Sequence, residues 1–396
     1  MSGNRIRLPV LKTVLSNPRM LRVRPSVSLF MLKYMKKFKI RNSGGQMFIH
    51  SHLPALNSPA FGRFIKEHLL NKGSGPSHAQ IGLTNACPQR CQYCYNRDHT
   101  GRVMDTDTIR AVIRDLKAMG VFWLGFTGGE PLLNKEIVSI TREAAGGCAI
   151  KLFTTGFGLT PALAADLRNA GLSSVSVSLD HWREDIHDYA RGYAGAFRTA
   201  LAAIKIFQDA GGLNVGVSAV LSREMIRRRE VEEFLVFLDG LELDEAWLSE
   251  TKPSIEAVWN PDIVIKEDER NYLFEIQDRW NRGSGLTVNY LGHFESREHF
   301  GCTAGHKMVY VDAFGDVGPC VFVPLTFGNV RERPLGEIFA DMRRLFPTED
   351  DCFINRNFEM LRPFAGRLPV GREDSLKIVE AARFGPLAGF FRLYYR

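Results

Sequence analysis

The sequence predicts an α/β protein built around an incomplete parallel barrel. Six short, nearly continuous apolar runs alternate with helical repeats of apolar residues. Strands this apolar must be covered on both faces, as in a parallel sheet whose crossover helices pack against it. The six runs span residues 81–84, 121–127, 150–154, 174–179, 215–220 and 246–249. Six strand–helix units are too few to close the eight-stranded barrel of the TIM type, so we predict a partial (β/α)6 barrel.

The segments between the runs follow the spacing of amphipathic helices. Over residues 106–119 the apolar positions Ile109, Val112 and Leu116 recur at intervals of three and four, and Gly120 then favours a helix end. Residues 161–170, 197–210 and 230–238 repeat this scheme. Because the carboxyl ends of parallel strands lie at one edge of the sheet, we expect ligands to bind there.

Three cysteines follow the first run with the spacing C-x3-C-x2-C, namely Cys87, Cys91 and Cys94. Thiolates this close together on one loop can hold an iron–sulfur cluster. Three ligands for four irons would leave one iron free to bind a small molecule, which favours chemistry over simple electron transfer. Taken alone, the spacing would also fit a zinc site that lacks one ligand, or three unrelated buried thiols.

A second motif ends the run at 121–127, where the chain reads Gly128-Gly129-Glu130-Pro131. Two glycines let the backbone come close to a ligand, and a glutamate can accept a hydrogen bond from an ammonium group. Together with the cysteine motif before it, this segment resembles the radical S-adenosylmethionine (SAM) superfamily.

The resemblance implies both the cofactors and the reaction. The three cysteines would hold a [4Fe–4S] cluster whose open iron binds the amino and carboxylate groups of SAM, while residues 128–131 would hold the methionyl amino group. An electron from a flavodoxin- or ferredoxin-type donor would cleave SAM into methionine and a 5′-deoxyadenosyl radical. That radical would abstract a hydrogen atom from the substrate.

Three residues further along extend the resemblance. Ser178 and Asp180 stand where the superfamily has a strand end near the ribose of SAM, and Arg191 would meet the SAM carboxylate. By residue type alone, Ser178 and Asp180 would equally suit a helix cap, and Arg191 would suit a solvated loop.

A second cysteine set lies after the predicted barrel. Residues 302–320, which carry Cys302 and Cys320, resemble the opening of SPASM and twitch auxiliary-cluster domains, and the resemblance implies a β-hairpin that presents these two cysteines. The likeness implies one auxiliary [4Fe–4S] cluster held by Cys302, Cys320 and Cys352, with a fourth ligand from Glu349, His306, another side chain or the substrate. Alternatively, Cys352 is a free thiol that returns a hydrogen atom to a substrate radical, or the domain has lost its cluster.

Both ends of the chain are basic and aromatic. The first 66 residues contain 13 Lys and Arg but no Asp or Glu. Residues 28–41 predict a basic amphipathic helix, and residues 384–396 add aromatics and arginines, so the ends, residues 1–40 and 384–396, could contact anionic lipid. The same helix could instead pack on its own barrel or bind another anionic partner, but nucleic acid is not expected.

The roles assigned to the cysteines and the hydropathy of the chain limit where in the cell the protein is expected. Six of the seven cysteines, all but Cys148, are assigned to clusters, which leaves no disulfide framework. No apolar run reaches the length of a membrane span. We therefore expect a cytoplasmic enzyme, with peripheral membrane contact as an option.

The sequence suggests four regions: a basic helical extension (1–77), the barrel (78–285), a small β-hairpin and helix domain for the auxiliary cluster (286–352) and a tail (353–396). The favoured function is hydrogen abstraction in peptide, natural-product or cofactor biosynthesis, with oxidation or bond formation as the outcome. The alternatives are a lipid- or isoprenoid-modifying enzyme, an epimerase that uses Cys352, and a non-catalytic iron–sulfur electron carrier.

Overall fold

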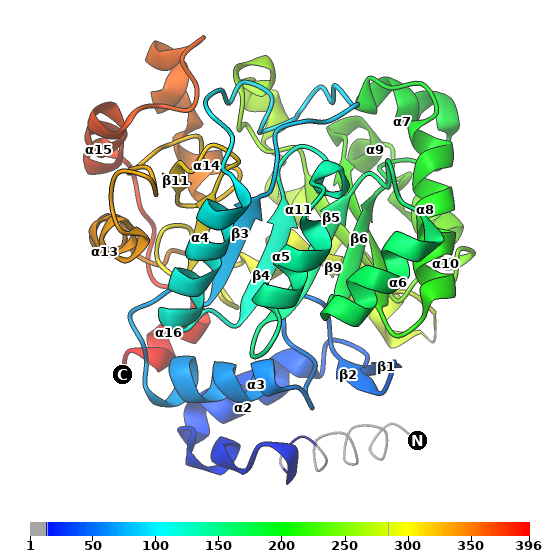
Figure 1. The fold of residues 1–396 in the computed structure, drawn as a ribbon, viewed down its shortest axis with the longest axis horizontal. Helices are drawn as coiled ribbons and strands as arrows, with labels where there is room; N and C mark the ends of the chain where they lie inside the picture. Colours follow the sequence, from blue (N-terminus) through cyan, green and yellow to red (C-terminus); the bar gives the residue numbers. More distant parts are fainter. Residues whose placement is uncertain (1–12, 14, 284) are drawn as a thin grey trace.

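The computed structural model describes residues 13, 15–283 and 285–396, and these form a barrel-like parallel sheet covered by helices (Figure 1). The sheet has nine strands in the order β11-β10-β3-β4-β5-β6-β7-β8-β9. Every neighbouring pair is parallel except β10 and β11. The strands are β3 (His78–Gly82), β4 (Trp123–Thr127), β5 (Ala149–Thr154), β6 (Ser174–Ser178), β7 (Asn214–Leu221), β8 (Glu245–Glu250), β9 (Thr287–Tyr290), β10 (Met308–Val311) and β11 (Val317–Gly318). The partial barrel predicted from the sequence is confirmed.

The outer face of the sheet is covered by the crossover helices. Ile109, Val112 and Leu116 in α4 are almost fully buried, as their spacing predicts. The helices are α4 (Thr106–Ala118), α5 (Ile137–Ala144), α6 (Pro161–Ala170), α7 (Glu184–Arg191), α8 (Ala196–Ala210), α9 (Arg223–Arg227), α10 (Val231–Asp239) and α11 (Glu267–Arg282), with short 3-10 turns η3 (Pro131–Leu133), η4 (Glu256–Val258) and η5 (Pro261–Ile263).

The sheet is larger than six strands. β9 pairs with β8, and β10 pairs with β3 at the opposite edge. β9 escaped prediction because its four residues alternate polar and apolar, although all are buried and Asn289 donates to Glu245 inside the barrel. The sheet therefore continues across residue 285, and the β10–β11 hairpin extends the barrel sheet itself. The four-region division stays a prediction.

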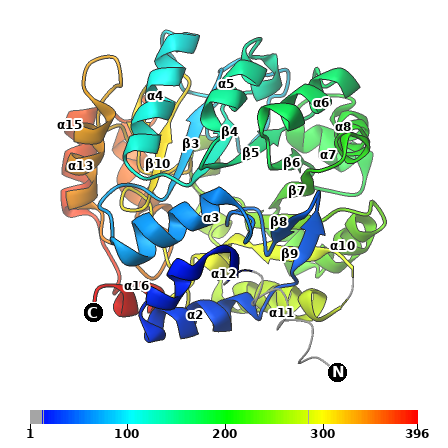
Figure 2. The same cartoon turned by 60° about the horizontal axis from the view of Figure 1, so that its bottom comes forward.

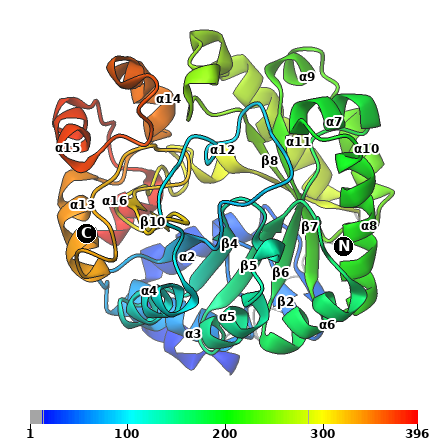
Figure 3. The same ribbon diagram turned by 45° about the horizontal axis from the view of Figure 1, so that its top comes forward.

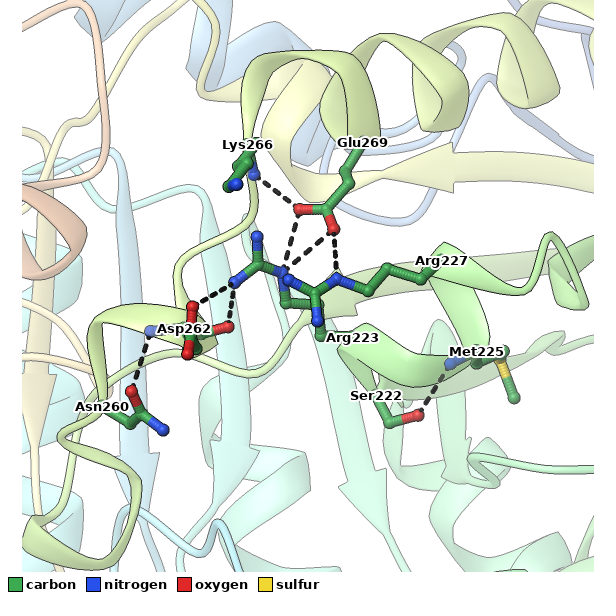
Figure 4. Close-up of polar contacts among 8 residues, drawn as sticks. All are labelled: Ser222, Arg223, Met225, Arg227, Asn260, Asp262, Lys266 and Glu269. Atoms are coloured by element: carbon green, nitrogen blue, oxygen red, sulfur yellow. Dashed lines mark hydrogen bonds and ion pairs between the residues drawn. The ribbon is translucent and has the colours of Figure 1, made fainter.

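A charged network fixes the start of α11 (Figure 4). The Glu269 carboxylate accepts hydrogen bonds from the backbone N–H of Lys266, at 2.7 Å, and from the side chains of Arg223 and Arg227 in α9. A carboxylate in the first turn also suits the positive end of a helix. Because α11 leads directly into β9, this network sets the position of the strand and of the short helix α12 (Leu291–Phe294) that follows.

The N-terminal region lies beneath the amino ends of the strands (Figure 2). Ser51 closes this end of the barrel, because it accepts hydrogen bonds from Lys151 and Trp247 at its hydroxyl and from Trp123 at its carbonyl. The elements of this region are η1 (Pro18–Arg22), α2 (Pro25–Met35), β1 (Arg41–Ser43), β2 (Gln46–Phe48), α3 (Pro59–Arg63) and the π-helix η2 (Phe64–Leu70).

The two basic, aromatic ends pack against each other. In α2, Phe30 lies 5.5 Å from Phe390 of α16 (Gly389–Tyr394) between ring centroids, and Met31 and Tyr34 are buried. The predicted helix over 28–41 is confirmed only in part. It begins earlier, at Pro25, because proline is well suited to the first helical position, and it ends at Met35, while Arg41 already belongs to β1. The apolar stripe that suggested lipid contact is therefore used for packing within the protein.

The predicted peripheral membrane contact is not supported, because the apolar residues that suggested it pack within the protein. Residues 1–12 and 14, which belong to the predicted membrane-contact segment 1–40, lie outside the described residues. Among the described residues, no helix has both the length and the apolar character that a membrane span needs.

The remaining C-terminal elements pack beside α4 and the hairpin (Figure 1). They are α13 (Leu335–Leu345), α14 (Phe353–Asn357), η6 (Phe358–Phe364) and α15 (Arg372–Ala381). The helix expected after the hairpin corresponds to α13, and Cys352 lies immediately before α14.

Candidate active site

The long loop between β3 and α4 crosses the carboxyl ends of the strands (Figure 3). Its cysteines, Cys87, Cys91 and Cys94, line one cavity of about 720 Å³ at this edge of the sheet. Other residues predicted to bind the cofactor also line this cavity, namely Gly128, Gly129, Ser178 and Arg191. The structure thus brings together motifs that the sequence keeps about 100 residues apart.

Gly128 and Gly129 are required by their contact with the cysteine loop. A Cβ on Gly128 would lie 2.3 Å from the Thr84 carbonyl oxygen, and one on Gly129 would lie 2.3 Å from that of Ala86. The backbone N–H of Gly129 donates to Thr84, and that of Glu130 donates to Ala86, at 2.7 and 2.8 Å. The sequence suggested close approach to a ligand; in the structure the close approach is to the loop that carries the cysteines.

Glu130 is fully buried and does not line the cavity. Its carboxylate accepts hydrogen bonds from the Thr154 and Thr155 hydroxyls and from the backbone N–H groups of Thr155 and Leu132, at 2.6–3.0 Å. Burial raises the pKa of Glu130, while these donors oppose the shift. In the structure Glu130 joins the ends of β4 and β5, with Pro131 beginning η3 beside it. Its binding of the SAM amino group stays a prediction.

Arg191 and Asp180 form a buried bidentate ion pair beside the cysteines. Both bonds, Arg191 Nε to Asp180 Oδ2 and Nη2 to Oδ1, measure 2.7 Å. The remaining nitrogen, Nη1, lies 4.0 Å from the Cys91 sulfur. Burial alone would raise the pKa of Asp180, but the Arg191 guanidinium outweighs it and the pKa is lowered. Tyr93 also donates to Asp180.

This pairing gives Asp180 and Arg191 different positions in the site. Arg191 lines the cavity, whereas Asp180 lies behind it and holds the guanidinium in place. Bidentate pairs of this kind orient an arginine firmly. The predicted contact of Asp180 with the ribose is not tested by these contacts, and neither is that of Ser178.

The three thiols fit a cluster in their chemistry. All are free cysteines, and burial raises the pKa of each, to about 11 for Cys87. Iron binds the thiolate, so cluster assembly would displace these protons. Among the described residues, no group of three His, Cys, Asp or Glu side chains converges closely enough for a single metal ion. In a cubane each thiolate binds a different iron, so its ligands lie further apart than those of a single ion.

Sequence reasoning missed several residues of this cavity. Thr154 and Thr155 line it at the end of β5, and Lys252 lines it just after β8. The only signal for them was their position at the end of a predicted strand. Lys252 is buried, and its ammonium donates to Glu250 Oε1 at 2.9 Å and to Glu295 Oε2 at 3.2 Å.

The second cysteine set also meets in space. Cys302, Cys320 and Cys352 line a cavity of about 160 Å³, although they lie before β10, after β11 and before α14. Burial raises the pKa of all three thiols, to about 12 for Cys320. The donor set therefore fits a cluster here too. Cys148, by contrast, is buried beneath the sheet and its thiol donates to the Val121 carbonyl.

The suggested fourth ligands point elsewhere. The Glu349 carboxylate accepts from Arg356 at 2.9 Å and from the backbone N–H of Gly385 at 3.1 Å. His306 bonds to the Phe346 carbonyl and the Tyr395 hydroxyl through its two ring nitrogens. Neither Glu349 nor His306 lines the second cavity.

The two cavities share a wall. Six residues line both of them: Gln80, Phe153, Ser218, Ser249, Val321 and Phe322. The Lys252–Glu295 ion pair crosses the same wall, because Lys252 lines the first cavity and Glu295 lines the second. A substrate in the first cavity would therefore lie beside the second cysteine set.

Two sequence families match the chain: the radical SAM superfamily over residues 81–236, and SPASM, described as an iron–sulfur cluster-binding domain, over residues 302–355. A PqqA peptide cyclase from Methylocella silvestris is 32% identical, with 65% of this chain and 72% of the relative aligned. An AdoMet-dependent heme synthase from Methanosarcina barkeri is 29% identical, with 65% and 80% aligned. The mycofactocin maturase MftC of Mycolicibacterium smegmatis is 26% identical, with 61% and 63% aligned.

Solved structures share the fold at lower identity. SuiB from Streptococcus suis, bound to S-adenosylmethionine, superposes with a TM-score of 0.59 at 16% identity, covering 78% of this chain and 79% of SuiB. Native anSMEcpe with bound AdoMet gives a TM-score of 0.53 at 15% identity, covering 68% and 83%.

The chain belongs to the radical SAM superfamily and carries a SPASM domain. It is an enzyme, so the electron-carrier alternative is wrong. Its cofactors are a [4Fe–4S] cluster, SAM and auxiliary iron–sulfur clusters bound by the SPASM domain. The roles of individual residues remain predictions.

Proposed function

We propose that this enzyme removes two electrons from a peptide or a cofactor precursor by radical chemistry. The shared wall between the two cavities carries the proposal, because a substrate radical formed in the first cavity would lie next to the second cysteine set. The named activities of the relatives, on PqqA peptide and in heme and mycofactocin formation, support this class of substrate.

The bound clusters supply one electron for SAM cleavage and accept one from the substrate radical. In the balance, one hydrogen atom would leave the substrate with 5′-deoxyadenosine, one electron would pass to an auxiliary cluster held by the second cysteine set, and one proton would go to solvent. The product has either a new bond or a double bond. The chain contributes by holding Cys91 beside Arg191 and by placing apolar side chains, the half-buried Phe153 and the buried Val321, around the reacting region.

The other candidate functions receive less support. Cys352 lines the second cavity and does not line the first, so no contact places its thiol at the substrate position that an epimerase would need. The lipid or isoprenoid alternative rested on the aromatic ends, which pack against each other.

SAM cleavage tests the first half of the proposal. Reconstituted protein with dithionite should convert SAM to 5′-deoxyadenosine, and Cys94→Ala should abolish this. Cys148→Ala is the matched control, because Cys148 lines neither cavity. Cleavage that persists in Cys94→Ala would show that the site is assigned wrongly.

The second half is tested with synthetic peptides. A peptide processed by the enzyme should become lighter by two hydrogen atoms, as mass spectrometry would show. A product of unchanged mass but inverted stereochemistry would mean epimerisation and would overturn the proposed oxidation.

A further inference from the structure

The second cavity contains one acidic side chain beside its three cysteines, among the residues that the structure describes. This is Glu295, which directly follows α12. Glu295 reaches the cavity from the end of α12, whereas Cys302 and Cys320 flank the β10–β11 hairpin and Cys352 precedes α14. The four side chains thus approach the cavity from three separate parts of the chain.

The Glu295 carboxylate has a single donor in the described residues. Lys252 donates to Oε2 at 3.2 Å, and no hydrogen bond is made to Oε1. The side chain keeps 15% of its surface exposed, and it lines the cavity. A carboxylate so placed has an oxygen free for another partner, since buried carboxylates normally accept several bonds.

The cavity gathers this carboxylate and the three thiols around one small space of about 160 Å³. The Lys252 ammonium lies beside Glu295 and donates to it at 3.2 Å. Thiolate and carboxylate groups are both ligands that iron accepts, so these four side chains form a donor set that fits a cluster.

We propose that Glu295 is the fourth protein ligand of the auxiliary cluster, alongside Cys302, Cys320 and Cys352. Lys252 then acts as a positioning residue that holds Oε2, which leaves Oε1 for iron. An iron–sulfur core carries positive charge and takes anionic ligands, so three thiolates and one carboxylate complete its coordination. The proposal concerns the cofactor site and does not depend on the identity of the substrate.

Two histidines are the remaining alternatives on the cavity wall. His78 uses both ring nitrogens, bonding to Ser77 and to the His52 carbonyl. His52 has a buried Nε2 without a partner, but its ring is stacked on Trp247 at 3.8 Å between centroids. The groups that shift the pKa of His52 besides burial are Lys151, His50 and His78, and none of the three cysteines is among them. His52 therefore serves as the matched control for Glu295.

The test uses the full chain with Cys87, Cys91 and Cys94 changed to alanine, so that only the auxiliary cluster can assemble. Glu295→Gln, Glu295→Cys, His52→Gln and Glu349→Gln are each made in this background. Iron and sulfide per chain and the electron paramagnetic resonance spectrum are measured after anaerobic reconstitution. Circular dichroism reports whether each variant is folded.

The background protein should hold about four irons. Glu295→Gln keeps the shape and the bond to Lys252 but removes the anionic ligand, so the spectrum of the reduced cluster should change. On mild oxidation the iron that has lost its protein ligand should leave, giving about three irons and the spectrum of a three-iron cluster. Glu295→Cys should restore about four irons with a lower reduction potential, because thiolate donates more electron density. His52→Gln and Glu349→Gln should match the background.

Two results would overturn the proposal. The first is a Glu295→Gln protein with about four irons and an unchanged spectrum. The second is loss of iron in His52→Gln or Glu349→Gln while Glu295→Gln retains it. If folded Glu295→Gln holds no cluster at all, Glu295→Cys decides: about four irons would support ligation, and none would refute it.

Discussion

The two cysteine sites of this enzyme are built in opposite ways. Cys87, Cys91 and Cys94 lie on one loop within eight residues and face a cavity of about 720 Å³. Cys302, Cys320 and Cys352 come from three separate segments and share a cavity of about 160 Å³. The first cavity is therefore large enough for a small molecule in addition to a cluster, whereas the second is much smaller.

The difference teaches how each site depends on the fold. The first loop carries all three of its cysteines and is held over the strands by its own contacts, among them the close approach of Gly128 and Gly129 and the hydrogen bond from Tyr93 to Asp180. The second site exists only when the hairpin, the segment before α14 and Glu295 are all in place. We therefore expect the first site to fail by local changes in its loop, and the second to fail by loss of any one of its separate supports.

Gly129→Ala should give the largest effect. Its Cβ would lie 2.3 Å from the Ala86 carbonyl oxygen, so the cysteine loop must move. We expect SAM cleavage to be lost and bound iron to fall from about eight to about four, with the auxiliary cluster retained. Iron analysis and 5′-deoxyadenosine assays measure this.

Gly371→Ala is the control, because no atom lies within 4 Å of its added Cβ. It should retain all the iron and activity. Full activity in Gly129→Ala would contradict the role of this contact.

Cys352→Ala should abolish the second cysteine site and leave the first one working. About four irons should be lost from the second site, while SAM cleavage without substrate continues at the first. Formation of the oxidised peptide should stop, because the substrate radical has no electron acceptor. If both SAM cleavage and iron at the first site disappear, the two sites do not assemble independently.

Arg191→Lys should weaken SAM binding without removing the cluster. Lysine cannot reproduce the bidentate contact with Asp180, so the group beside Cys91 loses its fixed position. We expect the KM for SAM to rise by roughly tenfold to a hundredfold.

The matched change is Arg183→Lys in the exposed pair with Asp185, which should leave the KM unchanged. Equal KM values for Arg191→Lys and wild type would show that Arg191 does not contribute to SAM binding.

The smallest expected effect is on stability, at the contact between the start of β10 and the segment before β3. Lys307, next to β10, is buried and donates to the carbonyls of Gly73 and Gly75. Burial, with Arg343 nearby, lowers the pKa of Lys307 from its ordinary 10.5 to about 7. Between these values the unfolded chain binds more protons than the folded one, so this lysine makes stability rise with pH from about 7 to about 10.5.

Lys307→Met should flatten that rise. Urea unfolding midpoints of wild type and variant at pH 7 and pH 9 measure it. An equally steep rise in the variant would show that Lys307 is not responsible.

The sequence located the first site more completely than the second. Short spacing on one loop reveals Cys87, Cys91 and Cys94 without any knowledge of the fold, and apolar runs predicted six strands to within a few residues. Cys302, Cys320 and Cys352 were grouped by resemblance, and in the structure all three line one cavity.

Contacts between distant segments could not be predicted in this way. Glu295 comes just after α12, which follows the short strand β9. The polar residues of β9 conceal the fact that this strand is buried, so nothing in the local sequence connects Glu295 with the cysteines on the hairpin. Glu349 looked suitable because it lies three residues before Cys352, yet Arg356 occupies its carboxylate. The basic amphipathic pattern of residues 28–41 and the aromatics and arginines of residues 384–396 suggested a membrane, whereas in the fold these two ends pack against each other.

The most direct test of two adjacent cluster sites is a count of iron and sulfide. Anaerobically reconstituted wild type is compared with the Cys87→Ala/Cys91→Ala/Cys94→Ala protein. Two sites predict about eight irons in the wild type and about four in the variant. About four irons in the wild type and none in the variant would show that the second site is empty, which would contradict both the oxidative function and the role of Glu295.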